Sequence, residues 1–525
     1  MTTATTATTA QPTTFLNIDT QAPHYKWIIA AIVLTAGATQ TFAGPTINIA
    51  IPRLMAAFGT DLAQTQWVAT AWLLTRTLVM PLLGWLGGML GNRNLFVGIM
   101  VGFVITTAGC GLSTSLPMMI TFRLLQGLVM GTAEGLTAVI MVTAFPPQQR
   151  GMALGLRAIG WSAGQVIFYT AGGYLLEEVS WRLIFFIGIP TGVIAAVAGF
   201  LVLPQQRDYK GEPVDYWGLL ALGGFLVPLL LAISFGRDDQ TATSTLVWLS
   251  LGALVGGGLF VLRELMTTYP TVNLRLFRLP IFRIICITAF FNNLGLFGAL
   301  FIVPIFLQQV IGLSPLQAGL VLVPALIISG LSGIVMGRLA DIFPPPAVVI
   351  TVMLALTAIF YSFSSVSALT ALPVIVIYVI LYRVCMTGSV TPLALLAVRQ
   401  LEADQVRMGQ GLLGVTRSIG SSLGVTVTSV VFERSRVAHQ LAAYNTYNAD
   451  SPVHQDTITQ VTGVLQQAGL SDAAANRMAL GAIRRQMDVE AITSAFQDSF
   501  LLVCTCFLCA SLPMVYMLFR GEKER

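Results

Sequence analysis

Fourteen apolar stretches, each about long enough to cross a bilayer, determine what this chain can fold into. A helix rises about 1.5 Å per residue, so about 20 apolar residues span the roughly 30 Å hydrocarbon core. Apolar residues make up 55% of the chain and charged residues only 10%, a charge content that excludes a set of soluble domains. The expected spans cover 27–49, 67–87, 94–113, 117–143, 151–175, 183–203, 216–235, 246–263, 284–309, 315–337, 347–366, 372–397, 408–432 and 494–518.

Lysine and arginine predict the orientation of these spans. An even number of spans places both termini on one side of the membrane. If that side is the cytoplasm, inner segments hold fifteen Lys and Arg residues, whereas the short outer loops hold three. We therefore expect a multi-pass protein of the cell (inner) membrane with both termini cytoplasmic. The polar outer segment 433–493 is either a solvated insertion or a contact surface for a partner.

The second half of the chain repeats part of the first. Arg157-Ala-Ile-Gly160 recurs 260 positions later as Arg417-Ser-Ile-Gly420. Equivalent spans run in the same direction, and parallel repeats of this kind are typical of transporters with a substrate site between two helical bundles. The paired glycines allow helices to approach closely, and helices could also slide there. The repeat pairs are Arg157 and Arg417, Gly160 and Gly420, Gly164 and Gly424, and Arg123 and Arg383.

The expected fold is therefore an all-α integral membrane protein, with two six-helix bundles and two inserted helices that have no counterpart in the repeat. We expect a disordered cytoplasmic N-terminus at 1–25, an N-terminal bundle at 26–204 and a two-helix linker at 205–270. The C-terminal bundle covers 271–519 and includes the outer segment 433–493, and a cytoplasmic tail follows at 520–525.

The sequence predicts no catalytic centre, cofactor or metal site. The six cysteines lie in apolar runs, where cysteine behaves as a small hydrophobic residue. Cys504, Cys506 and Cys509 could suggest a metal site, but no His or acidic residue lies near them. The chain has no G-x-x-x-x-G-K-[ST] phosphate loop. Its net charge of +5 is too small and scattered to indicate nucleic-acid binding.

Short motifs occur in the order and spacing of one known family. They include Asn48-Ile-Ala-Ile-Pro52, Phe122-Arg123-Leu-Leu-Gln126-Gly127, Pro146-Pro147-x-x-Arg150, Gly172-Gly173-Tyr174 and Val272-Asn-Leu274. Together they resemble the fourteen-helix drug:proton antiporters of the major facilitator superfamily, most closely the EmrB-like multidrug exporters. The resemblance implies proton-coupled efflux by alternating access. In a cell with an outer membrane, it also implies a periplasmic adaptor and an outer-membrane channel as partners.

The chain departs from this family at three places. Ala43 and Gly88 stand where the family usually has an Asp, and Phe168-Tyr169 replaces a Gly-Pro pair. These changes leave two alternatives open beside a proton-driven exporter. One is an uncoupled facilitator or a lipid or metabolite exporter of the same fold. The other is a membrane receptor or scaffold that no longer transports.

Ionisable side chains inside the expected spans mark the candidate site, because a charge within the bilayer usually has a function. Only one acidic residue, Glu134, lies deep within a span. We predict that Glu134 exchanges a proton and pairs with Arg157 or Arg76 when ionised. The alternative is a permanent salt bridge that lets charged helices pack. By resemblance, Arg123 has a coupling or structural role. The arginines within the spans are Arg76, Arg123, Arg157, Arg383 and Arg417.

The surplus of buried positive charge predicts an anionic or weakly acidic substrate, bound by Arg76, Arg157 and Arg417. Other groups are expected to line its path, although each could instead make a hydrogen bond between helices. We also expect Asp341 and Arg338 to form a cytoplasmic latch that stabilises one conformation. The other expected path residues are Gln40, Asn48, Trp72, Gln165, Tyr169, Asn292, Asn293 and Tyr382.

Overall fold

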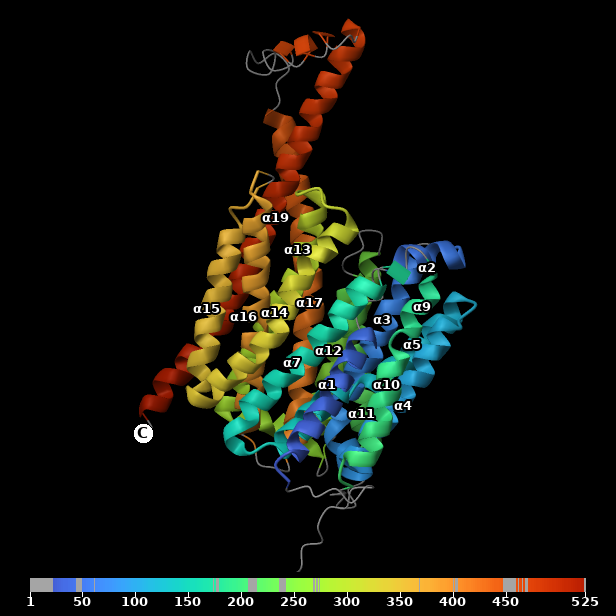
Figure 1. Ribbon diagram of the computed structural model, residues 1–525, viewed down its shortest axis with the longest axis vertical. Coiled ribbons are helices and arrows are strands. Elements are labelled where there is room, and N and C mark those ends of the chain that lie inside the picture. The colour runs from blue at the N-terminus through green and yellow to red at the C-terminus, as the bar shows by residue number, and fades with distance from the viewer. Residues whose placement is uncertain are drawn as a thin grey trace, which may run out of the picture.

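Long helices form the whole of the described fold, and no strand occurs within the described ranges (Figure 1). The computed structural model describes residues 22–43, 50–60, 62–172, 174–175, 179–205, 215–235, 242–267, 270, 272, 274–367, 369–399, 401, 405–446, 459–460, 462–464, 466–467 and 471–523.

The first half of the chain contains nine α-helices and three short turns of other helix types among the described residues. The α-helices are α1 (Tyr25–Ala43), α2 (Ile51–Phe58), α3 (Leu62–Val79), α4 (Leu83–Gly111), α5 (Leu116–Met130), α6 (Ala133–Ala144), α7 (Arg150–Ile167), α9 (Trp181–Phe186) and α10 (Ile189–Val202). The turns are 3-10 helices η2 (Met80–Leu82) and η3 (Pro147–Gln149), and the π-helix η4 (Phe168–Gly172).

The inserted helices and the second half follow. They are α11 (Tyr216–Phe235), α12 (Thr243–Met266), the 3-10 turn η5 (Leu274–Arg278), α13 (Pro280–Gln309), α14 (Pro315–Ile342), α15 (Pro345–Phe363), α16 (Leu372–Arg399), α17 (Val406–Thr446) and α19 (Asp472–Lys523).

Ten helical stretches of the described chain are long and apolar enough to cross a membrane. One of them, Trp67–Gly111, contains two expected spans, because Gly91 has φ 77° and ψ 155° and interrupts the helix there. The expected spans at 27–49, 151–175 and 408–432 coincide with α1, α7 and α17, which are helical but are not among the ten. Fourteen membrane helices are therefore compatible with the structure, and their number stays a prediction.

The two ends of the described chain lie at the same end of the bundle (Figure 1). We call this end the terminus side. The opposite end is the hairpin side, because α17 and α19 project beyond the bundle there. Their 41 and 52 residues correspond to helices about 60 and about 80 Å long, about twice the hydrocarbon thickness or more. Much of the predicted outer segment thus continues these two helices.

The packing of the helices shows the same repeat as the sequence. Gly160 of α7 lies so close to α1 that a side chain there would overlap the carbonyl oxygen of Leu34. Gly424 of α17 approaches the carbonyl oxygen of Leu294 in α13 in the same way. Leu34 and Leu294 are themselves 260 positions apart, so the paired glycines serve close helix contact, as predicted.

The apolar side chains form two large cores, one in each half. The two halves contact each other through particular helices on each side. On the terminus side, α7 packs against α14 through Gly155 and Gly333, where the backbones nearly touch. On the hairpin side, the inserted α11 lies between α3 and α17. Its Phe235 ring is 5.6 Å from Trp67 of α3, and its Ile233 carbonyl accepts a hydrogen bond from Thr426 of α17.

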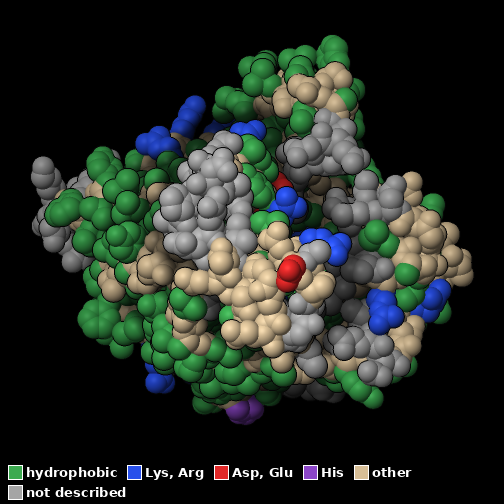
Figure 2. All heavy atoms as spheres, turned by 90° about the horizontal axis from the view of Figure 1, so that it is seen from above, with side chains coloured by type: hydrophobic (Ala, Val, Ile, Leu, Met, Phe, Trp, Pro, Cys, Tyr) green, Lys and Arg blue, Asp and Glu red, His purple; other side chains and the backbone are tan. Residues whose placement is uncertain are grey.

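The surface of the bundle is apolar. Trp248 and Leu254 of α12 are each at least 70% exposed, which fits contact with lipid rather than water. Viewed from the hairpin side, hydrophobic side chains lie around the rim, and charged side chains of both signs are visible toward the middle (Figure 2). The chain is therefore a multi-pass membrane protein.

Candidate functional site

A break between α5 and α6 places the one acidic residue found deep within a span. The expected span 117–143 is one helical stretch, Leu116–Ala144, interrupted only at Gly131 and Thr132, with α5 ending at Met130 and α6 beginning at Ala133. Glu134 therefore lies in the first turn of α6. A helix N-terminus carries partial positive charge, which stabilises a carboxylate there. The interruption thus places Glu134 at the start of α6, within the expected span 117–143.

Glu134 joins two arginines from different halves of the chain. Its Oε2 accepts a hydrogen bond from Arg76 Nη2 of α3 at 2.9 Å, and its Oε1 lies 3.5 Å from Arg417 Nη1 of α17. The first pair lies within the N-terminal half, and the second connects the two halves. The predicted partner Arg76 is therefore a direct one, and the sequence analysis did not predict the pairing with Arg417.

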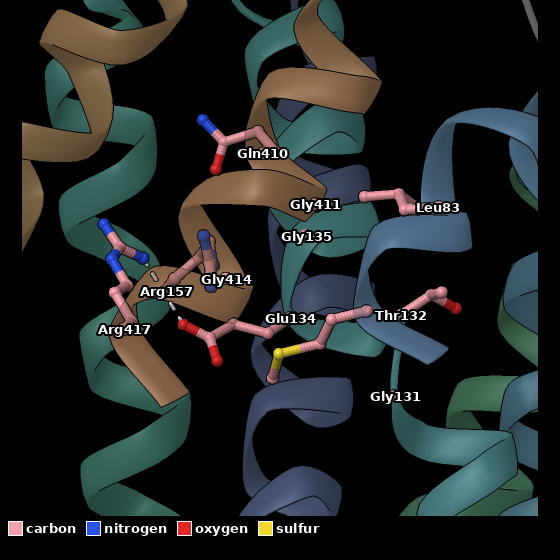
Figure 3. Close-up of a pocket in the computed structure, with 11 residues that line it drawn as sticks. Leu83, Gly131, Thr132, Glu134, Gly135, Arg157, Gln410, Gly411, Gly414 and Arg417 are labelled. Carbon is pink, nitrogen blue, oxygen red and sulfur yellow. Dashed lines mark ion pairs between the residues drawn. The ribbon is translucent and has the colours of Figure 1, made fainter. Parts of the chain in front are cut away.

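Arg157 shares a small cavity with this ion-pair cluster. It lies within electrostatic range of both Glu134 and Arg417. In Figure 3 the Glu134 side chain extends toward Arg157 and Arg417, and a dashed line marks its ion pair with Arg417. Four glycines leave the space open. The cavity is lined by Met80, Leu83, Gly131, Thr132, Glu134, Gly135, Arg157, Gln410, Gly411, Gly414 and Arg417.

The cavity has an excess of positive charge. Arg157 and Arg417 line it beside a single carboxylate, Glu134, which also pairs with Arg76, and no other acidic side chain is among the described lining residues. Arg417 uses Nη1 toward Glu134, whereas its buried Nε and Nη2 have no hydrogen-bond partner among the described atoms. Nε and Nη2 form one edge of the guanidinium, and such an edge can bind a carboxylate with two parallel hydrogen bonds. The arrangement can therefore hold a second anion.

Trp72 connects this cluster to another buried arginine. The Arg76 guanidinium lies 5.0 Å from the Trp72 ring centre, and that of Arg123 lies 5.5 Å from it. Arg123 itself points elsewhere. Its Nε donates to the Val68 carbonyl at 2.9 Å, and its Nη1 donates to Gln126 at 2.6 Å. Arg123 thus connects α5 to α3 and does not line the cavity around Glu134.

The predicted path residues lie at different places. Gln165 of α7 meets Arg383 of α16, with 3.5 Å between Oε1 and Nη1. Tyr169 interacts electrostatically with Arg383 and Tyr382. Gln40 is buried in α1, and Asn293 donates to the Ala289 carbonyl within α13. Asn292 is fully buried, with both polar atoms unpaired in the described structure. Asn48 lies outside the described residues.

The predicted latch has different partners from those expected. Asp341 accepts hydrogen bonds from the backbone N–H groups of Gly151 and Met152, at 2.8 and 2.9 Å. These groups begin α7, in the opposite half. The ion pair of Asp341 is with Arg399 at 3.4 Å, whereas Arg338 is exposed. The acid was visible in the sequence, but its partners required knowledge of which helix start faces it.

No group of three or more His, Cys, Asp or Glu side chains in the described structure could hold a metal ion. Cys504, Cys506 and Cys509 are free thiols along α19, two of them buried and the third exposed. Their packing supports the reading of these cysteines as small hydrophobic residues. Sequence reasoning missed Met80, Thr132 and Gln410 as cavity residues, because nothing in their local sequence distinguishes them.

Comparison with known proteins identifies the family. The model of the Major Facilitator Superfamily matches residues 27–425, and the chain belongs to this superfamily of transporters, not enzymes. It is 26% identical over 451 residues to the multidrug export protein EmrB of Escherichia coli (strain K12), covering 83% of this chain and 86% of that one. The predicted resemblance to EmrB-type exporters is thereby confirmed.

Two further similarities are relevant. The chain is 25% identical over 472 residues to the fatty acid resistance protein FarB of Neisseria gonorrhoeae, covering 90% of this chain and 91% of FarB. Among solved structures, the human organic anion transporter MFSD10 (TETRAN) superposes with a TM-score of 0.59 at 15% identity, covering 94% of this chain and 100% of that one. At this identity the structural likeness concerns the fold alone.

Proposed function

We propose that this transporter is a proton-coupled exporter of amphipathic organic anions and weak acids. The observation that carries the proposal is a single membrane carboxylate, Glu134, ion-paired to arginines of both halves within a cavity of net positive charge. The names of two similar proteins, a fatty acid resistance protein and an organic anion transporter, agree with an anionic substrate. The EmrB relative agrees with export.

In the proposed cycle, Glu134 carries the proton. While ionised, it holds Arg76 behind the cavity and Arg417 in the cavity wall, and the positive charge that remains binds the substrate anion. Protonation removes the charge of Glu134 and so breaks both ion pairs. Because the pair with Arg417 joins the halves, its loss destabilises the present arrangement relative to one opened on the other side. The proton then accompanies the return of the empty protein.

The test is flux of 1-naphthoate in proteoliposomes under an imposed pH gradient. We expect wild-type transport to stop when an ionophore collapses the gradient, and Glu134→Gln to transport without a pH response. Glu134→Asp, which keeps the charge, should retain the response. A Glu134→Gln profile identical to the wild-type profile overturns the proton-carrier role. Flux that survives gradient collapse in wild type indicates the facilitator alternative, and a complete lack of flux for all compounds indicates the receptor alternative.

The substrate class is tested by competition. Excess organic anions should inhibit 1-naphthoate flux, whereas quaternary ammonium compounds should not, because the cavity repels cations. Arg417→Gln should weaken inhibition by anions about tenfold, the effect of losing one charge-assisted hydrogen bond. Equal inhibition by cations and anions would contradict the anion preference.

The proposal includes an orientation of the protein in the membrane. With the terminus side in the cytoplasm, the α17–α19 hairpin projects outward, where a periplasmic adaptor and an outer-membrane channel could join it in a cell with an outer membrane. A single cysteine at exposed Leu441, in a variant lacking native cysteines, should react with a membrane-impermeant maleimide in intact cells. A cysteine at exposed Arg338 should react only after lysis. The reverse pattern contradicts this orientation.

A further inference from the structure

Arg123 and Arg383 occupy equivalent positions of the repeat, but only the Arg123 side chain has short hydrogen bonds in the described structure. Arg123 donates to Gln126, three residues further along α5, and to the Val68 carbonyl. The residue three positions after Arg383 is Met386, which offers only a weak acceptor. Arg383 therefore lacks the acceptor that its mate finds on its own helix, and it reaches across to the other half of the molecule.

Arg383 is nearly fully buried, at 4% exposure, and has little to balance its charge. Its described hydrogen bond, to Gln165 Oε1, is long at 3.5 Å, and its buried Nε has no partner in the described structure. None of the described ion pairs includes Arg383. A charge within a membrane is costly unless it is paired, so an unpaired guanidinium at this place indicates a partner that comes and goes.

The surroundings of Arg383 suit the acidic group of an aromatic molecule. Tyr169, from the π-helix η4, interacts electrostatically with Arg383, and the Arg383 guanidinium lies 5.7 Å from the centre of the Tyr382 ring. The Tyr382 hydroxyl is buried and without a hydrogen-bond partner among the described atoms. Hydroxyl and guanidinium donors bind an anionic oxygen, while tyrosine rings offer faces for stacking. Tyr169 belongs to the Phe168-Tyr169 pair that distinguishes this chain from the family pattern.

This group lies between the halves and further toward the hairpin side than the Glu134 cluster. Arg383 is sixteen residues from the end of α16 at Arg399, or about 24 Å. Arg417 is eleven residues from the start of α17 at Val406, or about 17 Å. Gln165, fifteen residues into α7, is about 22 Å along its helix, which agrees with its contact to Arg383.

We propose that Arg383, Gln165, Tyr169 and Tyr382 form a second binding station for the acidic group of an aromatic organic anion, on the hairpin side of the first. This inference rests on the proposed function, because it assumes that the substrate is an organic anion. A substrate that dissociates from Arg417 and Arg157 would bind at this station next, on its path between the halves. The two stations thus divide one passage into two shorter steps.

The test is calorimetric titration of the purified full-length protein with 1-naphthoate, with neutral 1-naphthamide as the matched ligand. Arg383→Gln should weaken naphthoate binding about tenfold, as expected for loss of a charged hydrogen bond, and leave naphthamide binding unchanged. Met386→Gln is the sharper variant. It keeps the arginine but gives it the acceptor that Arg123 has, so it should weaken naphthoate binding severalfold without removing any charge.

The outcomes separate the two proposals. If wild type binds naphthoate no better than naphthamide, the anion preference of the proposed function fails, and the second station fails with it. If wild type prefers naphthoate but Arg383→Gln and Met386→Gln bind it equally well, only the second station is overturned. If excess chloride displaces naphthoate as effectively as unlabelled 1-naphthalenesulfonate does, the site binds inorganic anions and the organic class is wrong. Thermal unfolding of each variant establishes that it is folded.

Discussion

At the scale of single residues, the buried arginines fall into two groups according to the groups that accept their hydrogen bonds. Arg76 and Arg417 meet a carboxylate, and Arg123 meets a backbone carbonyl and an amide. The contacts of Arg76 and Arg417 can change when a proton binds to Glu134. Arg123 has no titratable partner in the hydrogen bonds described. The two kinds should therefore respond differently to substitution.

Arg123→Gln is expected to lower stability. Shortening this side chain removes the charged hydrogen bond to the Val68 carbonyl, and such bonds contribute roughly 1.5–3 kcal/mol. Thermal unfolding of the purified protein in detergent measures the effect. Arg434→Gln, at an exposed position of the hairpin, is the matched control and should change little. Unfolding of Arg123→Gln at the wild-type temperature would show that these hydrogen bonds contribute nothing.

The sequence predicted that Glu134 and the arginines lie in the membrane, because each interrupts an apolar run. It predicted Arg76 or Arg157 as the partner of Glu134, but it could not predict the pairing with Arg417. Glu134 meets Arg417 from 283 positions away, a contact fixed by how helices of two halves rotate and pack. Likewise, the partners of Asp341 are backbone groups, which carry no signal in the sequence.

At the scale of helices, α7 packs against one helix in each half. One face packs on α1 through Gly160, and another packs on α14 through Gly155. The absence of side chains at these glycines lets the backbones meet. The contact with α14 is one of those that close the terminus side, so it must separate when that side opens.

Gly155→Ala should therefore favour opening on the terminus side. The added methyl group would overlap the carbonyl of Gly333, and backbone atoms cannot move aside cheaply. A cysteine introduced at Leu154, buried here, should then react faster with a water-soluble maleimide than in the otherwise wild-type protein. Gly88→Ala, where a methyl group would meet open space, is the control. Equal labelling rates in both variants would contradict the expected shift.

The inserted helices are held together at their terminus side by Asp215, just before α11. Its carboxylate lies 2.9 Å from Arg263 and accepts the Gly218 N–H at 3.0 Å. Burial acts to raise the pKa of Asp215, but the hydrogen bonds from Arg263 and Gly218 outweigh it and hold the pKa below its ordinary value. The ionised carboxylate thus stabilises the fold at neutral pH, and this stabilisation is lost as the pH falls through the lowered pKa.

Asp215→Asn should lower the unfolding temperature at neutral pH, because the amide cannot replace the ion pair with Arg263. The difference from wild type should shrink as the pH falls through the lowered pKa of Asp215, because the wild-type carboxyl also becomes neutral there. Thermal unfolding across this pH range measures both effects. Glu490→Gln, at an exposed position, should show no comparable change. A difference that stays constant with pH would contradict the role of the charge.

The positions of most helices followed from hydropathy, since lipid requires long apolar stretches. Their internal breaks did not. The Gly91 kink, the interruption between α5 and α6, and the π-turn after Ile167 all lie within or beside apolar runs. Hydropathy averages over such single positions, although the α5–α6 break is the feature that places Glu134.

At the scale of the whole molecule, the structure is closed on the terminus side. The glycines of α7 and α14 meet there, and Asp341 holds the start of α7 across the boundary between the halves. A carboxylate at a helix N-terminus typically contributes about 0.3–1 kcal/mol, and up to about 2 kcal/mol when partly buried. This amount is enough to shift a balance between two conformations severalfold.

Asp341→Asn should therefore populate the conformation that is open on the terminus side. Spin labels at exposed Gln148 and at exposed Phe343, one on each half, should show a larger fraction of long distances by pulsed electron resonance. Arg338→Gln is the control, because Arg338 is exposed and Asp341 pairs with Arg399 instead. An unchanged distance distribution in Asp341→Asn, or the same change in Arg338→Gln, would contradict the latch described here.

The acid of this latch has no counterpart in the other half, since Gly88 stands at the related turn. The halves meet on the terminus side along two seams, α7 against α14 and α4 against α17, where Gly84 approaches Met408. These seams are consequently unequal in strength. Separation should begin at the α4–α17 seam, with the α7–α14 seam parting last and serving as the hinge. The halves would then swing apart with a twist, and a molecule entering from that side would find a wedge-shaped mouth on one flank.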